Sequence, residues 1–103
     1  MAVSYTTHNR VLTVALSGEI DHHRVKGLLQ ELDREIDEVL PRALTVDFSA
    51  VPFMDSSGVA VILRLWRRME ALGGGISVTG MAEQPARVFQ AAGLARLIPP
   101  ASP

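Results

Sequence analysis

The sequence predicts an α/β fold, a single domain in which a mixed β-sheet of four to five strands packs against three to four helices. Short stretches rich in β-branched residues alternate with longer stretches in which apolar residues recur at helical spacing, in the order ββαβαβα. This alternation predicts right-handed crossovers and hence a parallel part of the sheet. With 103 residues the chain has room for one hydrophobic core and not for two, so one domain over residues 1–103 is expected.

The chain opens with two expected strands, Val3–His8 and Val11–Leu16, both rich in β-branched residues. Only Asn9-Arg10 separates them, and such a two-residue connection predicts an antiparallel hairpin. Ser17-Gly18 then ends the second strand.

The first helix is expected between Asp21 and Leu40. Asp21 is a suitable N-cap residue, and Pro41 ends the helix because the residue before a proline avoids the helical conformation. The apolar stripe of this helix consists of Val25, Leu28, Leu29, Leu32, Ile36, Val39 and Leu40.

A third strand is expected at Ala43–Phe48, which is apolar enough to be buried on both faces of the sheet. Ser49–Asp55 is expected to be a loop, because Pro52 cannot donate a hydrogen bond to a β-ladder. A second helix follows from about Ser57. One face carries Val59, Ile62, Leu63, Trp66 and Met69, and the other largely carries Arg64, Arg67 and Arg68.

Three consecutive glycines, Gly73–Gly75, are expected to end the second helix. They lack the lysine and serine or threonine of a phosphate-binding loop and precede a strand rather than a helix, so a phosphate-loop role is disfavoured. A strand at Ile76–Thr79 comes next. A third helix has Pro85 in its first turn and Gly93 just beyond its end. Leu97-Ile98 is expected to form a short fifth strand before a proline-rich tail.

The composition narrows the range of functions. The formal net charge of -1 gives no reason to expect binding to nucleic acid or to an anionic membrane. The chain has no cysteine, which excludes disulfides, thiolate metal sites and cysteine nucleophiles and fits a cytoplasmic protein. The longest apolar run, Val59–Leu63, is far shorter than the ~20 residues of a membrane-spanning helix, and no secretory signal is visible.

His22 and His23 are the candidate metal ligands. Adjacent residues on a helix point about 100° apart, and no residue at ligand spacing completes a site, so no metal is expected. The charge distribution along the first helix opposes the helix dipole. A solvated helix surface explains this more simply than a surface that meets an anionic partner, but both interpretations stay open. The basic group is His22, His23, Arg24 and Lys26, and the acidic group is Glu31, Asp33, Glu35, Asp37 and Glu38.

Ser56 and Ser57 stand at the expected start of the second helix. A serine hydrolase is disfavoured because the nucleophile-elbow pattern G-x-S-x-G is absent around them. Asp55 or Ser56 is expected to cap the helix. A helix start also tolerates a phosphate, since its free N–H groups and its dipole favour anions. The phosphate would add roughly -1.5 to -2 charges to the surface at pH 7, so the position suits a phosphorylation switch.

Two blocks of the sequence resemble the STAS domain family, and within it the anti-sigma factor antagonists. One block runs from Val46 to Val59, with the sequence VDFSAVPFMDSSGV, and the other is Ser17–His23, with the sequence SGEIDHH. The Asp-His-His of the second block favours the sporulation branch of the family, whose members free sigma F. The order of strands, helices and glycines agrees with the family from about Val3 to Ile98, nearly the whole chain.

The resemblance implies a partner-switching protein without catalytic residues or a cofactor. The unphosphorylated protein would bind an anti-sigma factor that is also a serine kinase and so release the sigma factor. Phosphorylation would end the binding, and a serine phosphatase would restore it. By the match, Ser56 is the phosphate acceptor, and Asp21 is the acid near that site, expected within side-chain reach of Ser56. The residues assigned to the partner-binding surface are Asp21, Asp55, Ser57 and Gly58.

Two alternatives remain open. One is a STAS module of another assembly, such as a stress-signalling complex or a lipid-transport accessory. Such modules often lack the acceptor serine, so the intact Asp55-Ser56-Ser57-Gly58 argues against this alternative. The other is an enzyme or a nucleotide-binding protein, which the absence of a phosphate-loop pattern disfavours.

Overall fold

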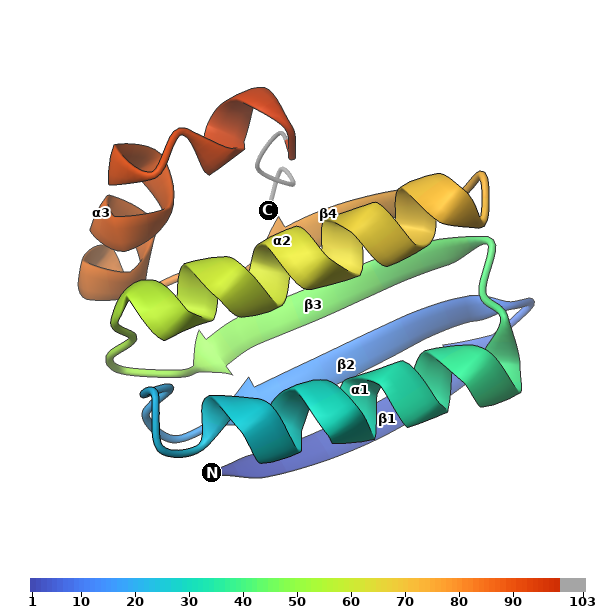
Figure 1. Ribbon diagram of the computed structural model, residues 1–103, viewed down its shortest axis with the longest axis horizontal. Helices are drawn as coiled ribbons and strands as arrows, with labels where there is room; N and C mark the ends of the chain where they lie inside the picture. Colours follow the sequence, from blue (N-terminus) through green and yellow to red (C-terminus); the bar gives the residue numbers. More distant parts are fainter. Residues whose placement is uncertain (99–103) are drawn as a thin grey trace.

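The computed structural model describes residues 1–98 and has one mixed sheet with helices packed on it (Figure 1). Its strands and helices follow the predicted order, so the predicted fold class is confirmed with four strands and three α-helices. The proline-rich tail, residues 99–103, lies outside the described residues. The elements are β1 (Ala2–His8), β2 (Val11–Ser17), α1 (Val25–Val39), β3 (Ala43–Ala50), α2 (Ser56–Ala71), β4 (Gly75–Thr79), α3 (Glu83–Ala91) and a 3-10 helix at Leu94–Arg96.

The strands lie in the sheet in the order β1-β2-β3-β4. β1 pairs antiparallel with β2, whereas β2 with β3 and β3 with β4 form parallel pairs. Asn9 (φ 52°) and Arg10 (φ 62°) are both left-handed, as a two-residue hairpin turn of type I′ requires. The predicted hairpin is therefore confirmed, with His8 opposite Val11.

Both long helices, α1 and α2, cover the same face of the sheet, and their first turns lie at the end where β2 and β3 finish (Figure 1). In β3, Leu44, Val46 and Phe48 are at most 1% exposed, while the residues between them are only partly buried. The prediction that this strand is buried on both faces is wrong, because both crossover helices lie on one face. The buried core between sheet and helices contains Leu12, Val14, Leu16, Leu28, Leu32, Ile36, Leu44, Val46, Phe48, Val61, Ile62, Leu65 and Met69.

Leu97-Ile98 does not form the predicted fifth strand. The two residues follow the 3-10 helix, and the Ile98 N–H donates a 2.8 Å hydrogen bond to the carbonyl oxygen of Leu94. Ile98 is 0% exposed. Its apolar character therefore serves to pack this turn on the core, which a short apolar pattern does not distinguish from strand pairing.

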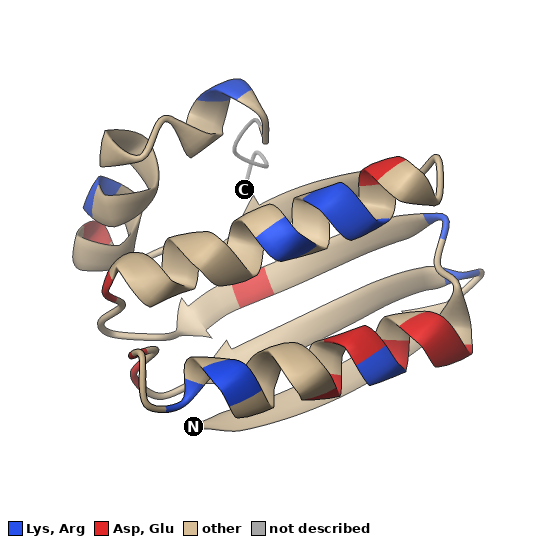
Figure 2. Cartoon of the chain, viewed as in Figure 1, with Lys and Arg blue, Asp and Glu red and all other residues tan. Residues whose placement is uncertain are grey.

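Two of the five acidic residues in the second half of α1, Asp33 and Asp37, form ion pairs with α2. Asp33 of α1 lies 2.7 Å from Arg64 and 3.3 Å from Arg68 of α2, measured between carboxylate oxygens and guanidinium nitrogens. Asp37 also pairs with Arg68. Figure 2 shows the acidic residues of α1 beside the basic residues of α2. These ion pairs give Asp33 and Asp37 a partner on the neighbouring helix.

The three glycines after α2 have different roles. Gly73 has a φ of +71° just beyond the helix, which confirms the predicted helix stop. A Cβ atom on Gly74 would lie 2.6 Å from the carbonyl oxygen of Arg42, so this position allows no side chain. A Cβ atom on Gly75 would meet nothing within 4 Å.

We expect Gly74→Ala to lower the free energy of unfolding by about 1–3 kcal/mol, because backbone atoms must move to admit the methyl group. Gly75→Ala is the matched control and should leave stability nearly unchanged. Urea unfolding followed by circular dichroism measures both variants. Equal stability of the two would contradict the close packing of Gly74 against Arg42.

Candidate functional site

The loops that follow β2 and β3 meet at one end of the sheet. Ile20 and Met54 form an isolated parallel bridge there, and both are 0% exposed. The Ile20 N–H donates to the carbonyl oxygen of Phe53 at 3.1 Å. The Ile20 carbonyl oxygen accepts from the N–H of Asp55, also at 3.1 Å. The segment that carries Asp21 is therefore fixed beside the segment that leads into α2.

Asp55 is the N-cap residue of α2. Its backbone is extended, and its Oδ1 accepts a 2.8 Å hydrogen bond from the N–H of Ser57. Its carbonyl oxygen accepts from the N–H of Gly58 at 3.0 Å. The prediction that Asp55 or Ser56 caps the second helix is confirmed with Asp55 as the cap, and the helix begins at Ser56, one residue earlier than expected.

The side chain of Asp55 is an ionised carboxylate at neutral pH. The backbone N–H of Ser57 holds the pKa of Asp55 below its ordinary value, desolvation opposes this, and the neighbouring His22 acts in the same direction as Ser57. His22 Nδ1 lies 3.9 Å from Asp55 Oδ2. The two loops are therefore joined by an electrostatic contact as well as by backbone hydrogen bonds.

The two serines differ in their accessibility. Ser56 is exposed at the first residue of α2. Ser57 is partly buried, and its N–H is bound to the Asp55 carboxylate. Of these two serines, Ser56 is therefore the one that the start of α2 presents to solvent.

Close packing explains why position 58 is a glycine. It is buried, and an added Cβ atom would lie 2.6 Å from the sulfur of Met54. The first turn of α2 therefore rests directly on the side chain of the bridge residue Met54. A contact between Gly58 and a partner protein stays a prediction.

Asp21 caps a turn rather than α1 itself. Its Oδ1 accepts hydrogen bonds from the N–H groups of His23 (3.0 Å) and Arg24 (3.1 Å). The Asp21 carbonyl oxygen accepts from the N–H groups of both Arg24 and Val25 at 3.1 Å, and the regular helix starts only after this turn. The prediction that the first helix begins after Asp21 is therefore wrong, and α1 begins at Val25. The role of Asp21 toward Ser56 stays a prediction.

The rings of His22 and His23 lie against each other, with centroids 4.0 Å apart, and both residues are exposed. In residues 1–98, no group of three histidine, aspartate or glutamate side chains could hold a metal ion. No helix in the same stretch is long and apolar enough to cross a bilayer.

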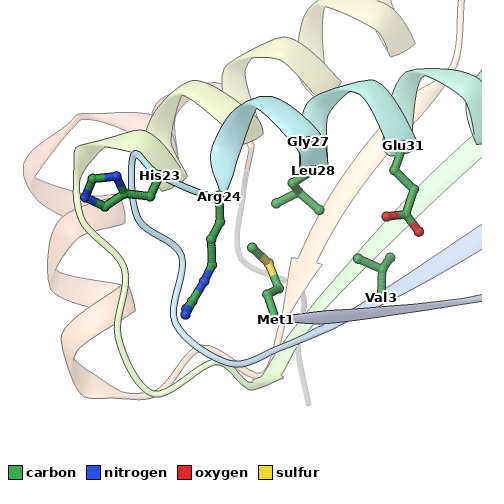
Figure 3. A pocket seen from close by; sticks show the side chains of 7 residues that line it. All are labelled: Met1, Val3, His23, Arg24, Gly27, Leu28 and Glu31. Carbon is green, nitrogen blue, oxygen red and sulfur yellow. The ribbon is translucent and has the colours of Figure 1, made fainter.

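A surface hollow of about 390 Å³ lies between the start of the chain and the first turns of α1 (Figure 3). Met1, Val3 and Leu28 give it an apolar part, and Arg24 and Glu31 bring opposite charges to it. Because both signs of charge are present, the hollow has no evident preference for an anion. Its other lining residues are His23 and Gly27, so Ser56 and Asp55 do not take part in it.

Two features of the site were missed by sequence reasoning. Phe53 is 41% exposed on the loop before Asp55. Gln84 in the first turn of α3 binds the backbone of Met54 through both ends of its side-chain amide. No local pattern predicts either feature. For Gln84 the pattern even misleads, because a polar residue in the first turn of an amphipathic helix is expected to face solvent.

Residues 2–102 match the model of the STAS domain family, so the chain belongs to this family. The anti-sigma F factor antagonist of Paenibacillus polymyxa is 32% identical over 92 residues, covering 89% of this chain and 79% of that protein. The resemblance to anti-sigma factor antagonists, expected from the two sequence blocks, is confirmed by this match.

Two solved structures show the same similarity. The anti-sigma factor antagonist SpoIIAA in its unphosphorylated form superposes with a TM-score of 0.83 at 28% identity, covering 98% of this chain and 89% of that chain. The phosphorylated form of SpoIIAA, a Bacillus cell fate determinant, superposes with a TM-score of 0.74 at 28% identity, covering 98% of this chain and 92% of that chain.

We expect Asp55→Asn to be less stable than the wild type at pH 7 and the difference to shrink as the pH falls below about 4. The lowered pKa of Asp55 means that its ionised form stabilises the fold above the unfolded-state pKa. This contribution is lost as the pH falls through the folded-state pKa, whereas asparagine keeps the cap acceptor without titrating. Urea unfolding from pH 7 to pH 3 measures the difference, with Glu83→Gln as an exposed control. A difference that is constant with pH would contradict the assignment.

Proposed function

We propose that this chain is an anti-sigma factor antagonist that works by partner switching in the cytoplasm, as one STAS domain without catalytic residues or a cofactor. Its unphosphorylated form binds an anti-sigma factor that is also a serine kinase and so releases the sigma factor. The kinase transfers a phosphoryl group from ATP to Ser56 Oγ, giving ADP and a proton, and the complex dissociates. A serine phosphatase restores the hydroxyl group by hydrolysis. Neither nucleic acid nor a membrane takes part.

The observation that carries this proposal is the placement of Ser56. It is exposed at the first residue of α2, directly after the ionised cap Asp55 and beside the bridge of Ile20 with Met54. A kinase therefore meets a hydroxyl group on a backbone of fixed position. The similarity to the anti-sigma F factor antagonist of Paenibacillus polymyxa, which extends over 89% of this chain, supports the same role.

Phosphorylation would act by local charge. A phosphate on Ser56 adds roughly -1.5 to -2 charges next to the carboxylate of Asp55, on a surface that a partner must cover. Like charges brought together at an interface cost several kcal/mol, which is enough to end binding. The start of α2 tolerates the anion, because its free N–H groups and its dipole favour negative charge. The similarity of this chain to both forms of SpoIIAA supports a switch that keeps the fold.

We expect Ser56→Ala to retain the anti-sigma factor in the presence of ATP and Ser56→Asp to bind it more weakly than the wild type in its absence. Ser57→Ala is the matched control, and it should still be phosphorylated on Ser56, because the Ser57 hydroxyl group is not the acceptor. Binding is measured by calorimetry with the purified anti-sigma factor, and the modified residue by mass spectrometry after kinase treatment. A phosphate on Ser57, or equal affinity of all variants, would refute the switch at Ser56.

For Asp21, two variants separate charge from capping. Asp21→Asn keeps a side-chain acceptor for the N–H groups of His23 and Arg24, so it should fold with nearly wild-type stability. Asp21→Ala removes the acceptor and should cost about 1 kcal/mol. If the negative charge contacts the partner, both variants should lose affinity for the anti-sigma factor. Normal binding by a less stable Asp21→Ala would show that the residue serves only the turn.

A further inference from the structure

The backbone of Met54 has an unusual hydrogen-bonding partner. In its parallel bridge, Ile20 bonds to the residues on either side of Met54, which are Phe53 and Asp55. The N–H and C=O groups of Met54 itself therefore point away from Ile20, to the side where a further strand would pair. β4 ends at Thr79 and supplies no backbone there.

The side-chain amide of Gln84 takes the place of that strand. Its Oε1 accepts a 2.9 Å hydrogen bond from the Met54 N–H, and its Nε2 donates a 2.9 Å hydrogen bond to the Met54 carbonyl oxygen. The amide thus makes the two bonds that two residues of a facing parallel strand would make. Because Met54 is fully buried, loss of these bonds would leave two polar backbone groups without their partner in a poorly solvated place.

Met54 transmits this restraint to the phosphorylation site. A Cβ atom added to Gly58 would lie only 2.6 Å from the Met54 sulfur. The Met54 side chain therefore packs directly against the first turn of α2. Its backbone is followed directly by Asp55, the cap, and then by Ser56. Among the described contacts, the backbone partner of residues 53–55 from a distant part of the chain is Ile20.

We propose that Gln84 is a positioning residue for the phosphorylation switch, which makes α3 part of the switch. The inference rests on the proposed function of Ser56. Gln84 holds Met54 so that Asp55 and Ser56 keep one conformation, the one in which the kinase meets the serine. Without the amide, the loop samples other conformations and only part of the molecules present Ser56 correctly.

The first experiment uses Gln84→Ala in the full chain. Amide hydrogen exchange of Met54 and Asp55 should accelerate relative to the wild type, while exchange in β2 and β3 stays unchanged. With the anti-sigma factor kinase, the KM for this chain should rise by about tenfold at unchanged kcat, since apparent affinity falls with the fraction of competent molecules. Glu83→Ala is the matched control, because the neighbouring Glu83 is exposed and, within residues 1–98, forms an ion pair with Arg87 alone.

A second variant distinguishes positioning from a general loss of stability. In Gln84→Glu, a neutral carboxyl group can donate and accept as the amide does, whereas an ionised carboxylate cannot donate to the Met54 carbonyl oxygen. Protection of the Met54 amide should therefore approach the wild-type value below a pH of about 4 and fall above it. The wild type measured at the same pH values accounts for the titration of Asp55, which lies in the same segment.

The role of the amide would be overturned if the Met54 N–H of Gln84→Ala exchanged as slowly as in the wild type. It would also be overturned if exchange of the Met54 N–H in Gln84→Glu did not depend on pH. Faster exchange with an unchanged KM would overturn its role in phosphorylation. The proposed function fails separately, if the wild type is not phosphorylated on Ser56. The exchange measurements need no kinase and still decide whether Gln84 holds the loop.

Discussion

Ile20 and Met54 are joined by a bridge whose two backbone hydrogen bonds connect loops that are separated in the sequence by α1 and β3. This contact extends the pairing of β2 with β3 beyond the point where regular strands end. The turn at Asp21 and the cap at Asp55 both leave from it. A loop in solution must lose conformational entropy to present a side chain in one place, and here the bridge has already removed that freedom. The surface around Ser56 is therefore held by the sheet.

Local features of the fold could be predicted from the sequence because their causes are local. The hairpin turn at Asn9-Arg10, the helix stop at Gly73 and the cap at Asp55 each depend on residues close in the chain. Apart from the start of α1, which lies at Val25 rather than directly after Asp21, the errors concern partners that are distant in the chain. Whether β3 is covered on one face or both depends on which side each crossover helix packs, and Leu97-Ile98 looks like a strand until the core that buries Ile98 is known.

The candidate site also has features that the sequence predicts and features that it does not. Asp55 could be recognised as a cap because capping depends on residues close in the chain, and Ser56 is singled out by the resemblance of its sequence block to the STAS family. The contact of His22 with Asp55 and the bonds of Gln84 to Met54 could not be recognised, since nothing near either residue in the sequence specifies its partner. The same holds for Asp33 of α1, whose partners Arg64 and Arg68 lie on the neighbouring helix. Patterns in the sequence identify Ser56 as the proposed acceptor, and the tertiary structure identifies the groups around it.

The bridge also determines at which stage of folding the surface around Ser56 forms. The β1–β2 hairpin closes over a two-residue turn, whereas Ile20 and Met54 meet only after the whole β2-α1-β3 crossover is in place. Contacts between distant parts of a chain form late, because the entropy of closing the loop must be overcome first. A partially folded chain would carry Ser56 on a loose segment without its neighbours. A partner that recognises the assembled surface therefore discriminates finished molecules from those still folding, and release of a sigma factor would be limited by the supply of completed protein.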